Sequence, residues 1–118
     1  PLAPARRLLD AGAAIALASN CNPGSSYTNS MPFCVATAVL QMGLTIDEAV
    51  WAATRGGARA LGRDTGADAV GSLRVSGRAD FQVLAAPSVV HLAYRPGVPL
   101  TAAVWRGGIR TPPITAGF

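Results

Sequence analysis

The chain has 118 residues and a mass of 12.0 kDa, which suits one small domain or a part of a larger protein. Half of the residues are hydrophobic and only 14% are charged, so the composition excludes a disordered chain and is typical of the interior of something bigger. The net charge of +4 comes from ten arginines that are scattered singly apart from Arg6-Arg7. Because no basic run forms, we expect no nucleic-acid partner.

Cysteine spacing and hydropathy bear on the cellular compartment. Cys21 and Cys34 lack the C-x-x-C spacing, and no charged start leads into an apolar signal core, so we expect reduced cysteines in a cytoplasmic protein. Residues 11–46 carry no formal charge, but polar residues at 19–26 interrupt this stretch. Its apolar pieces are shorter than the roughly 20 residues that cross a bilayer, and we expect no membrane segment.

The first sixty residues have the pattern of an α/β protein. Residues 3–11 predict a short amphipathic helix that ends at a glycine. Residues 13–18 are a continuous apolar run, typical of a strand buried on both faces in a parallel sheet. The polar stretch 19–30 is the clearest loop of the chain. Residues 31–42 then predict a buried helix, with Pro32 in its first turn.

A capping box opens the next predicted helix. The Thr45 hydroxyl can accept a hydrogen bond from the Glu48 amide while the Glu48 carboxylate reaches back to the Thr45 amide. We expect this helix to continue to Leu61. The pair Gly56-Gly57 inside it marks a bend or a close contact, because each glycine weakens a helix by about 1 kcal/mol relative to alanine.

From residue 71 onward the pattern predicts short strands separated by turns. Residues 72–75, 79–84 and 101–106 are the strand candidates, and pairs containing glycine or proline separate them. The last fifty residues therefore predict antiparallel β-structure. The tail 111–118 has two prolines and little pattern, and we expect it to be loosely held.

The loop 19–26 is the first candidate site. A polar loop after a buried parallel strand lies where α/β proteins place their sites. Its side-chain amides and hydroxyls, with the turn at Pro23-Gly24, can direct donors toward a carboxylate, a phosphate or a ring carbonyl. An ordinary surface loop that caps the next helix fits the same spacing.

The residues alone complete no catalytic set. His91 is the only histidine, so a histidine-containing zinc site cannot form from this chain by itself, and a histidine in a β segment is more often a packing or surface residue. Cys21 has no base nearby in sequence, and we expect a buried, inert thiol there. Asp10 and Asp80 are most simply structural.

The candidate loop also carries a family resemblance. Residues 16–26, followed by Ser30-Met31-Pro32, resemble the last barrel strand and loop of the imidazolonepropionases, a family of the amidohydrolase superfamily. Residues 71–75 and 79–81 resemble the superfamily's return into a small β-sandwich domain. The resemblance covers nearly the whole chain through four further segments, which are 40–42, 48–50, 58–62 and 91–97.

The resemblance implies an α/β fold that is incomplete on its own. Residues 1–65 would supply the last βα units of a metal-dependent (β/α)₈ barrel, and residues 66–118 would supply part of a composite β-sandwich with a loose tail. A complete barrel needs roughly 250 residues. We therefore expect the C-terminal portion of a longer cytoplasmic enzyme, inactive by itself, whose parent takes a small-molecule substrate and can form a homodimer.

The resemblance also implies a reaction and its residues. The family hydrolyses 4-imidazolone-5-propanoate to N-formimino-L-glutamate in histidine degradation, with a zinc or iron ion that activates the water. The position of the family's metal-binding, proton-accepting aspartate matches Asn20, which makes Asn20 the catalytic and metal candidate. Asn22 and Gly24 match positions that hold the product, and Ser25 matches one that contacts the substrate.

Asn20 departs from the family pattern and keeps alternatives open. A neutral amide retains an oxygen for a metal but cannot accept a proton at neutral pH. Another cyclic amidase or aminohydrolase of the same superfamily is one alternative. A non-catalytic remnant or interaction module, which kept the packing and lost the chemistry, is the other.

Overall fold

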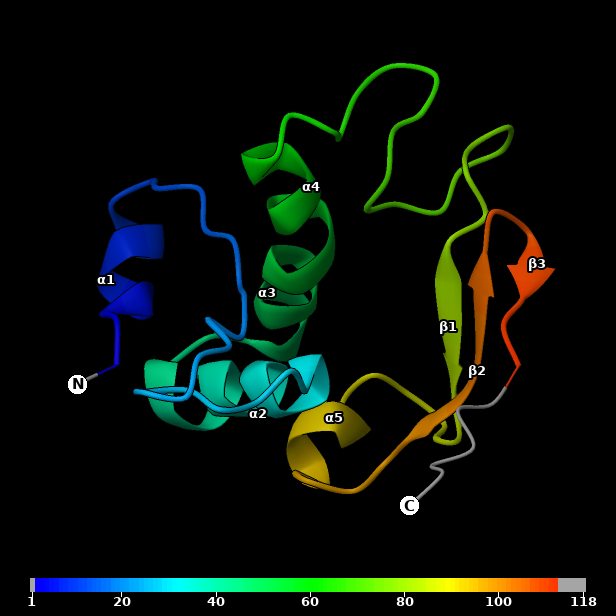
Figure 1. Ribbon diagram of the computed structural model, residues 1–118. Helices are drawn as coiled ribbons and strands as arrows, with labels where there is room; N and C mark the ends of the chain where they lie inside the picture. Colours follow the sequence, from blue (N-terminus) through cyan, green and yellow to red (C-terminus); the bar gives the residue numbers. More distant parts are fainter. Residues whose placement is uncertain (1, 113–118) are drawn as a thin grey trace.

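The computed structural model describes residues 2–112, which form a helical part followed by a small sheet (Figure 1). The expected loose tail falls largely on residues 113–118, outside the described residues, whereas the Thr111 amide donates to the Val104 carbonyl at 2.9 Å. In chain order the elements are α1 (Ala5–Asp10), α2 (Met31–Met42), α3 (Ile46–Trp51), the π-helical turn η1 (Ala52–Gly56), α4 (Gly57–Ala60), β1 (Phe81–Leu84), α5 (His91–Tyr94), β2 (Thr101–Arg106) and β3 (Ile109–Arg110).

Helix α2 has the predicted bounds, and local chemistry explains both of its ends. The Ser30 hydroxyl accepts a hydrogen bond from the Phe33 amide at 3.3 Å, and proline occupies the first turn, where it costs no hydrogen bond. Gly43 ends the helix in the left-handed region with φ +74°. Cys34, Val35 and Ala38 are buried on the face that packs into the core.

The predicted capping box is present at the start of α3. The Thr45 amide donates to Glu48 Oε2 at 2.8 Å, and the Glu48 amide donates to Thr45 Oγ1 at 3.2 Å. The same carboxylate accepts a hydrogen bond from Arg6 Nη1 at 2.8 Å, so one acidic side chain both caps α3 and ties it to α1. The helix then continues through η1 and α4, with a π-helical turn that the sequence pattern did not predict.

Two predicted strands are absent. Residues 13–18 run without regular structure, with their alanines exposed and Ile15 and Leu17 half-buried. A buried parallel strand needs neighbouring strands, and none flanks this segment within residues 2–112. The Leu17 amide instead donates a hydrogen bond to the Ala52 carbonyl at 2.9 Å. Residues 72–75 are likewise irregular, and Val75 is 98% exposed.

The C-terminal part forms the expected antiparallel sheet, in the order β1-β2-β3. Strand β2 has the predicted bounds, and β1 covers the last four of the six residues predicted for it. Phe81 lies opposite Trp105, and their rings stack with centroids 4.8 Å apart. The short strand β3 was not predicted. His91, placed in a β segment by the sequence, lies instead in the short helix α5.

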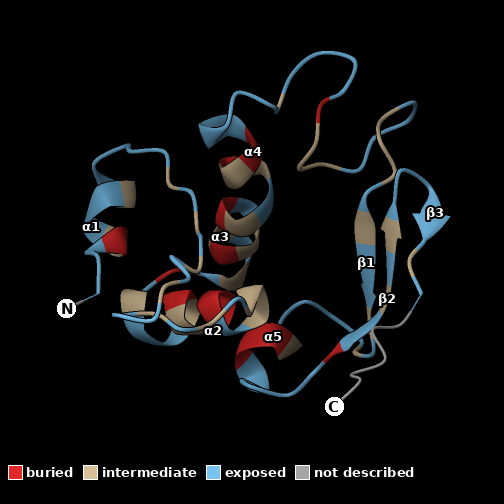
Figure 2. Ribbon diagram, in the orientation of Figure 1, coloured by how far each residue is buried: buried red, intermediate tan, exposed pale blue. Residues whose placement is uncertain are grey.

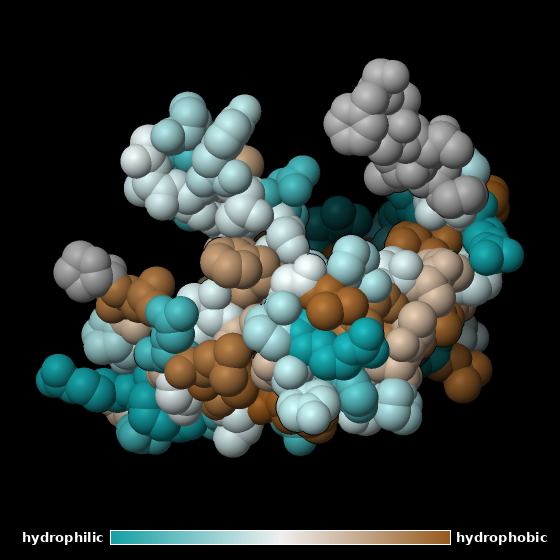
Figure 3. All heavy atoms as spheres, turned by 90° about the horizontal axis from the view of Figure 1, so that it is seen from below, coloured by the Kyte–Doolittle hydropathy of each residue, from teal (hydrophilic) through white to brown (hydrophobic). Residues whose placement is uncertain are grey.

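The interior is thin and lies on the helical side (Figure 2). Its main cluster joins α1, α2, α3 and α5 around Val35, Leu44, Leu92 and Leu100. The accessible surface is 8208 Å², whereas a compact 12 kDa monomer exposes about 6000 Å². Hydrophobic side chains accordingly show on the surface between polar ones (Figure 3). No helix within residues 2–112 has the length and apolar character needed to cross a bilayer.

Candidate functional site

The loop after residue 18 is organised around the side chain of Asn22. Asn22 Oδ1 accepts hydrogen bonds from the Gly24 and Ser25 amides, each at 2.9 Å, and from the Ser25 hydroxyl at 3.2 Å. Asn22 Nδ2 donates to the Asn20 carbonyl at 2.6 Å and to Ser25 Oγ at 3.1 Å. This is the short-range pairing by which asparagine stabilises turns.

Backbone and hydroxyl contacts close the base of the loop. The Asn22 amide donates to the Ser26 carbonyl at 2.9 Å, and the Ser26 amide donates back to Asn22 at 3.2 Å. The Ser26 hydroxyl donates to the Ser19 carbonyl at 2.5 Å. The loop is therefore a closed turn whose two stems are joined, and it leads through Ser30 into the capped start of α2.

The structure brings the four candidate residues Asn20, Asn22, Gly24 and Ser25 into one hydrogen-bonded turn. Their exposures differ. Asn22 is half-buried and both ends of its amide are engaged within the turn, whereas Asn20, Gly24 and Ser25 are exposed. Asn22 is thus the residue that shapes the loop, and Asn20 and Ser25 are the ones whose side chains a ligand can reach.

Asn20 has an unusual backbone conformation. Its φ of +49° lies in the left-handed region, which asparagine tolerates better than most residues with a side chain. This residue lies next to the exposed thiol of Cys21, where the sequence had predicted a buried one. The prediction was wrong because the thiol lies in the polar turn and not in the preceding apolar segment. Cys34 is the buried cysteine, and burial raises the pKa of its thiol.

Within residues 2–112, no group of three His, Cys, Asp or Glu side chains comes together in a geometry that could hold a metal ion. Asn20 contributes a single neutral amide oxygen. Asp80, expected to be structural, accepts a hydrogen bond from the Gly107 amide at 2.6 Å and pairs with Arg78, so it holds the turn between β2 and β3.

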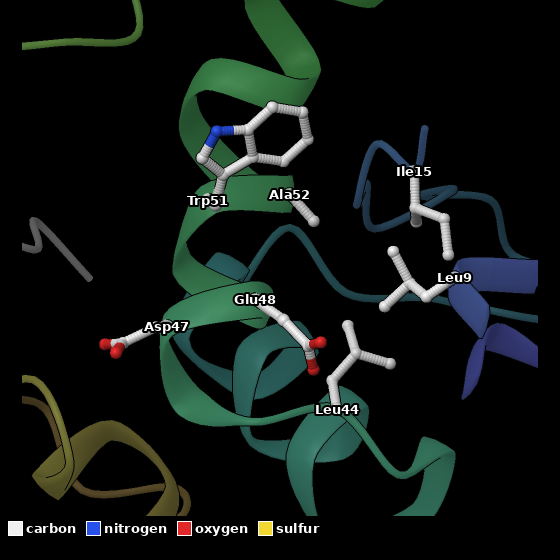
Figure 4. Close-up of a pocket in the computed structure, with 7 residues that line it drawn as sticks. All are labelled: Leu9, Ile15, Leu44, Asp47, Glu48, Trp51 and Ala52. Atoms are coloured by element: carbon white, nitrogen blue, oxygen red, sulfur yellow. The ribbon is translucent and has the colours of Figure 1, made fainter. Parts of the chain in front are cut away.

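An apolar cleft lies away from this loop, between α1, Ile15 and α3 (Figure 4). It has a volume of about 360 Å³, and Leu9, Ile15 and Leu44 point into it. The Glu48 carboxylate at its wall is already bound by Arg6 and Thr45, and Asp47 points away. The cleft therefore offers apolar contact and no charge for a polar ligand.

The sequence predicted a close contact at Gly56-Gly57 as one of two possibilities, but it did not identify the partner, which is the segment before the loop. A side chain on Gly56 would lie 2.4 Å from the Ile15 carbonyl oxygen, so the segment before the loop rests directly on the π-helical turn. The Gly56-Gly57 pair was the available signal, and of its two predicted meanings the close contact is confirmed at Gly56.

The chain was compared with known proteins. A scan against models of protein families finds no match. The imidazolonepropionase of Saccharopolyspora erythraea is 72% identical over 110 residues, which cover 93% of this chain and 28% of that protein. Those of Paenarthrobacter aurescens and Micrococcus luteus are 66% and 67% identical over 115 and 110 residues, again 93% of this chain and 28% and 27% of the relatives.

These matches confirm the resemblance drawn from the loop. The chain spans little more than a quarter of the length of the curated relatives it matches.

Proposed function

We propose, on the premise that this chain carries a segment of the imidazolonepropionase family, that the whole protein hydrolyses 4-imidazolone-5-propanoate to N-formimino-L-glutamate. Water adds across an amide C–N bond of the ring, which opens, and no other reactant is needed. The observation that carries the proposal is the 72% identity over 93% of the chain to a protein named for this activity. On this proposal the segment is a C-terminal portion of a cytoplasmic, metal-dependent hydrolase.

The proposal assigns a place in the fold to each part of the chain. Residues 1–65 belong to the end of a (β/α)₈ barrel and residues 66–118 to a composite β-sandwich. The irregular segment 13–18 would become the last barrel strand once neighbouring strands lie on both sides of it. Its exposed alanines and half-buried Ile15 and Leu17 support this, because a barrel strand needs apolar residues on both faces.

The proposed site lies in the turn 20–26. In this proposal the hydroxyl of Ser25, an exposed residue, contacts the substrate, and the Gly24 backbone and Asn22 hold the product end. Asn22 would do this by fixing the turn, since its own amide is engaged within it.

The described residues do not fit a metal ion by themselves. Asn20 offers one neutral oxygen, and within residues 2–112 no cluster of ionisable ligands stands near it. On this proposal the ligands of a zinc or iron ion come from other parts of the whole protein. An oligomeric parent, such as a homodimer, belongs to the same proposal.

Asn20 favours a second candidate function. If no other group accepts the proton that an aspartate would take at this position, the whole protein is a non-catalytic relative that keeps the fold and the substrate turn. The two candidates therefore differ in whether another group replaces the proton acceptor that Asn20 cannot supply.

A full-length chimera separates them. In it, this chain replaces the matching 110 residues of the Saccharopolyspora erythraea relative, and loss of 4-imidazolone-5-propanoate is followed with Asn20 and with Asn20→Asp. We expect Asn20→Asp to raise turnover by about 10²–10⁴-fold, the usual contribution of a positioned proton acceptor.

Asn29→Asp is the matched control, because it adds the same charge at an exposed position of the same loop. It should leave turnover unchanged. Measurable turnover with Asn20 itself would support the hydrolase. A folded chimera without turnover when residue 20 is Asn, whether or not Asn20→Asp restores it, while the unaltered relative turns over the substrate, would favour the non-catalytic candidate.

A further inference from the structure

The contact between η1 and the segment 13–18 requires a residue without a side chain at position 56. A Cβ atom on Gly56 would lie 2.4 Å from the Ile15 carbonyl oxygen and 2.9 Å from Trp51 Cζ3. Atoms do not approach that closely without displacement, so any side chain here would push residue 15 away from the helix. The helix itself does not require glycine, because φ −60° and ψ −45° at Gly56 are ordinary helical values.

A hydrogen bond fixes the same segment two residues further on. The Leu17 amide donates to the Ala52 carbonyl at 2.9 Å, and Ala52 is the first residue of the π-helical turn. Gly56 is the last residue of that turn. Both ends of η1 therefore touch the segment 13–18, and turns of this kind occur often at functional sites.

The anchored segment connects directly to the candidate site. Leu17 is two residues before Ser19, whose carbonyl accepts the hydrogen bond from the Ser26 hydroxyl that closes the turn. Ser19 adjoins Asn20, whose carbonyl binds Asn22 Nδ2. A displacement of residues 15–17 would thus move both stems of the turn as a unit, without breaking the hydrogen bonds inside it.

We infer that Gly56 is a positioning residue for the substrate turn 20–26. By admitting the Ile15 carbonyl against η1 while Ala52 binds Leu17, it sets where the turn lies relative to the helices. The inference rests on the proposed function for the identity of the ligand, and on the contacts above for the positioning itself.

The adjacent glycine supplies a matched control. Gly57 has the same helical conformation, with φ −62° and ψ −45°, but a Cβ there would meet nothing closer than the Ala52 carbonyl at 3.9 Å. Gly56→Ala and Gly57→Ala therefore make the same chemical change, one residue apart in one helix. Only the first displaces the segment 13–18.

The test uses the full-length chimera carrying Asn20→Asp. Hydrogen–deuterium exchange over residues 13–19 and calorimetric titration with N-formimino-L-glutamate are compared for the two glycine variants. We expect Gly56→Ala to accelerate exchange and to weaken product binding by the folded protein, each by about tenfold, because small misplacements of a binding group are costly. Gly57→Ala should change neither.

If Gly56→Ala fails to fold, replacing the backbone amide of Leu17 by an ester in a semisynthetic chimera keeps the test decisive. The ester removes the donor to Ala52 without touching η1 and without a proline ring in the segment 13–18. The ester variant should bind the product more weakly than the same folded protein with the Leu17 amide.

The outcomes separate the two claims. Faster exchange in Gly56→Ala with no product binding in any variant would retain the positioning role and overturn the proposed function. Equal exchange and equal product affinity in Gly56→Ala and Gly57→Ala would overturn the positioning role alone. A lower melting temperature with unchanged affinity of the folded protein would also overturn it, because the glycine would then be merely structural.

Discussion

At the scale of single residues, the candidate site is one amide group and its neighbours. Asn22 satisfies five hydrogen-bonding contacts inside the turn 20–26, and Asn20 adopts the left-handed backbone that lets the chain turn there. Local pairing of this kind depends on residue type and spacing, which is why the Asn-Pro-Gly-Ser sequence predicts a turn before any tertiary contact is known. The conformation of the turn then determines which of its polar groups a ligand can reach.

Removing the side-chain amide of Asn22 should therefore destabilise the conformation of the turn. In the chimera we expect Asn22→Ala to weaken N-formimino-L-glutamate binding by about tenfold or more, because the Gly24 and Ser25 amides lose their common acceptor. Calorimetric titration measures the change. Asn29→Ala is the control, an exposed asparagine of the same loop, and equal binding by the two variants would contradict the role of Asn22.

At the scale of elements, Glu48 joins α1 to α3 and gives the helical part a pH dependence. The pKa of its carboxyl is lowered, first by the Thr45 amide and then by Arg6. A carboxyl with a lowered pKa in the folded state stabilises the protein above its unfolded pKa of about 4.3, and this stabilisation is lost as the pH falls through the lower folded value. The Gly107 amide lowers the pKa of Asp80 in the same direction.

The expected result is a fall in the melting temperature of the chimera between the unfolded pKa of Glu48, about 4.3, and the lower folded value. Glu48→Gln removes the charge throughout, so its melting temperature should lie below that of the parent at neutral pH and approach it in acid. Thermal melts at a series of pH values measure both. A difference that stays constant across the series would show that the Glu48 charge contributes nothing.

Elements were predictable from the sequence where short-range interactions determine them. Helix α2 and the capping box at Thr45 follow from caps and a glycine stop, and β2 follows from its strand-forming residues between turns. The segment 13–18 was predicted wrongly as a strand, since strand formation needs partners that the described residues do not provide. The turn η1 was missed because a π turn changes the helical period over only a few residues.

At the scale of the whole molecule, apolar surface exceeds what the interior can bury. Eight of the thirteen buried hydrophobic residues in the described part of the chain are alanines, and a buried methylene contributes only about 0.8 kcal/mol. Leu61, Leu73, Val75 and Ile109 are each more than 70% exposed. The radius of gyration, 14.9 Å, exceeds the value of about 13.5 Å expected for a compact chain of this length.

The 118-residue chain by itself should therefore lack a cooperative thermal transition and should self-associate, because its alanine-rich core cannot offset the conformational entropy of folding and its exposed apolar side chains attract other copies. The same residues within the full-length chimera should melt cooperatively. Circular dichroism on heating and light scattering after size exclusion measure the two properties. Leu73→Ser with Val75→Ser, changed together at two exposed positions, should reduce association without altering the far-ultraviolet spectrum. A monomeric chain with one sharp transition would instead mean that the small core suffices and that the apolar surface has no missing partner.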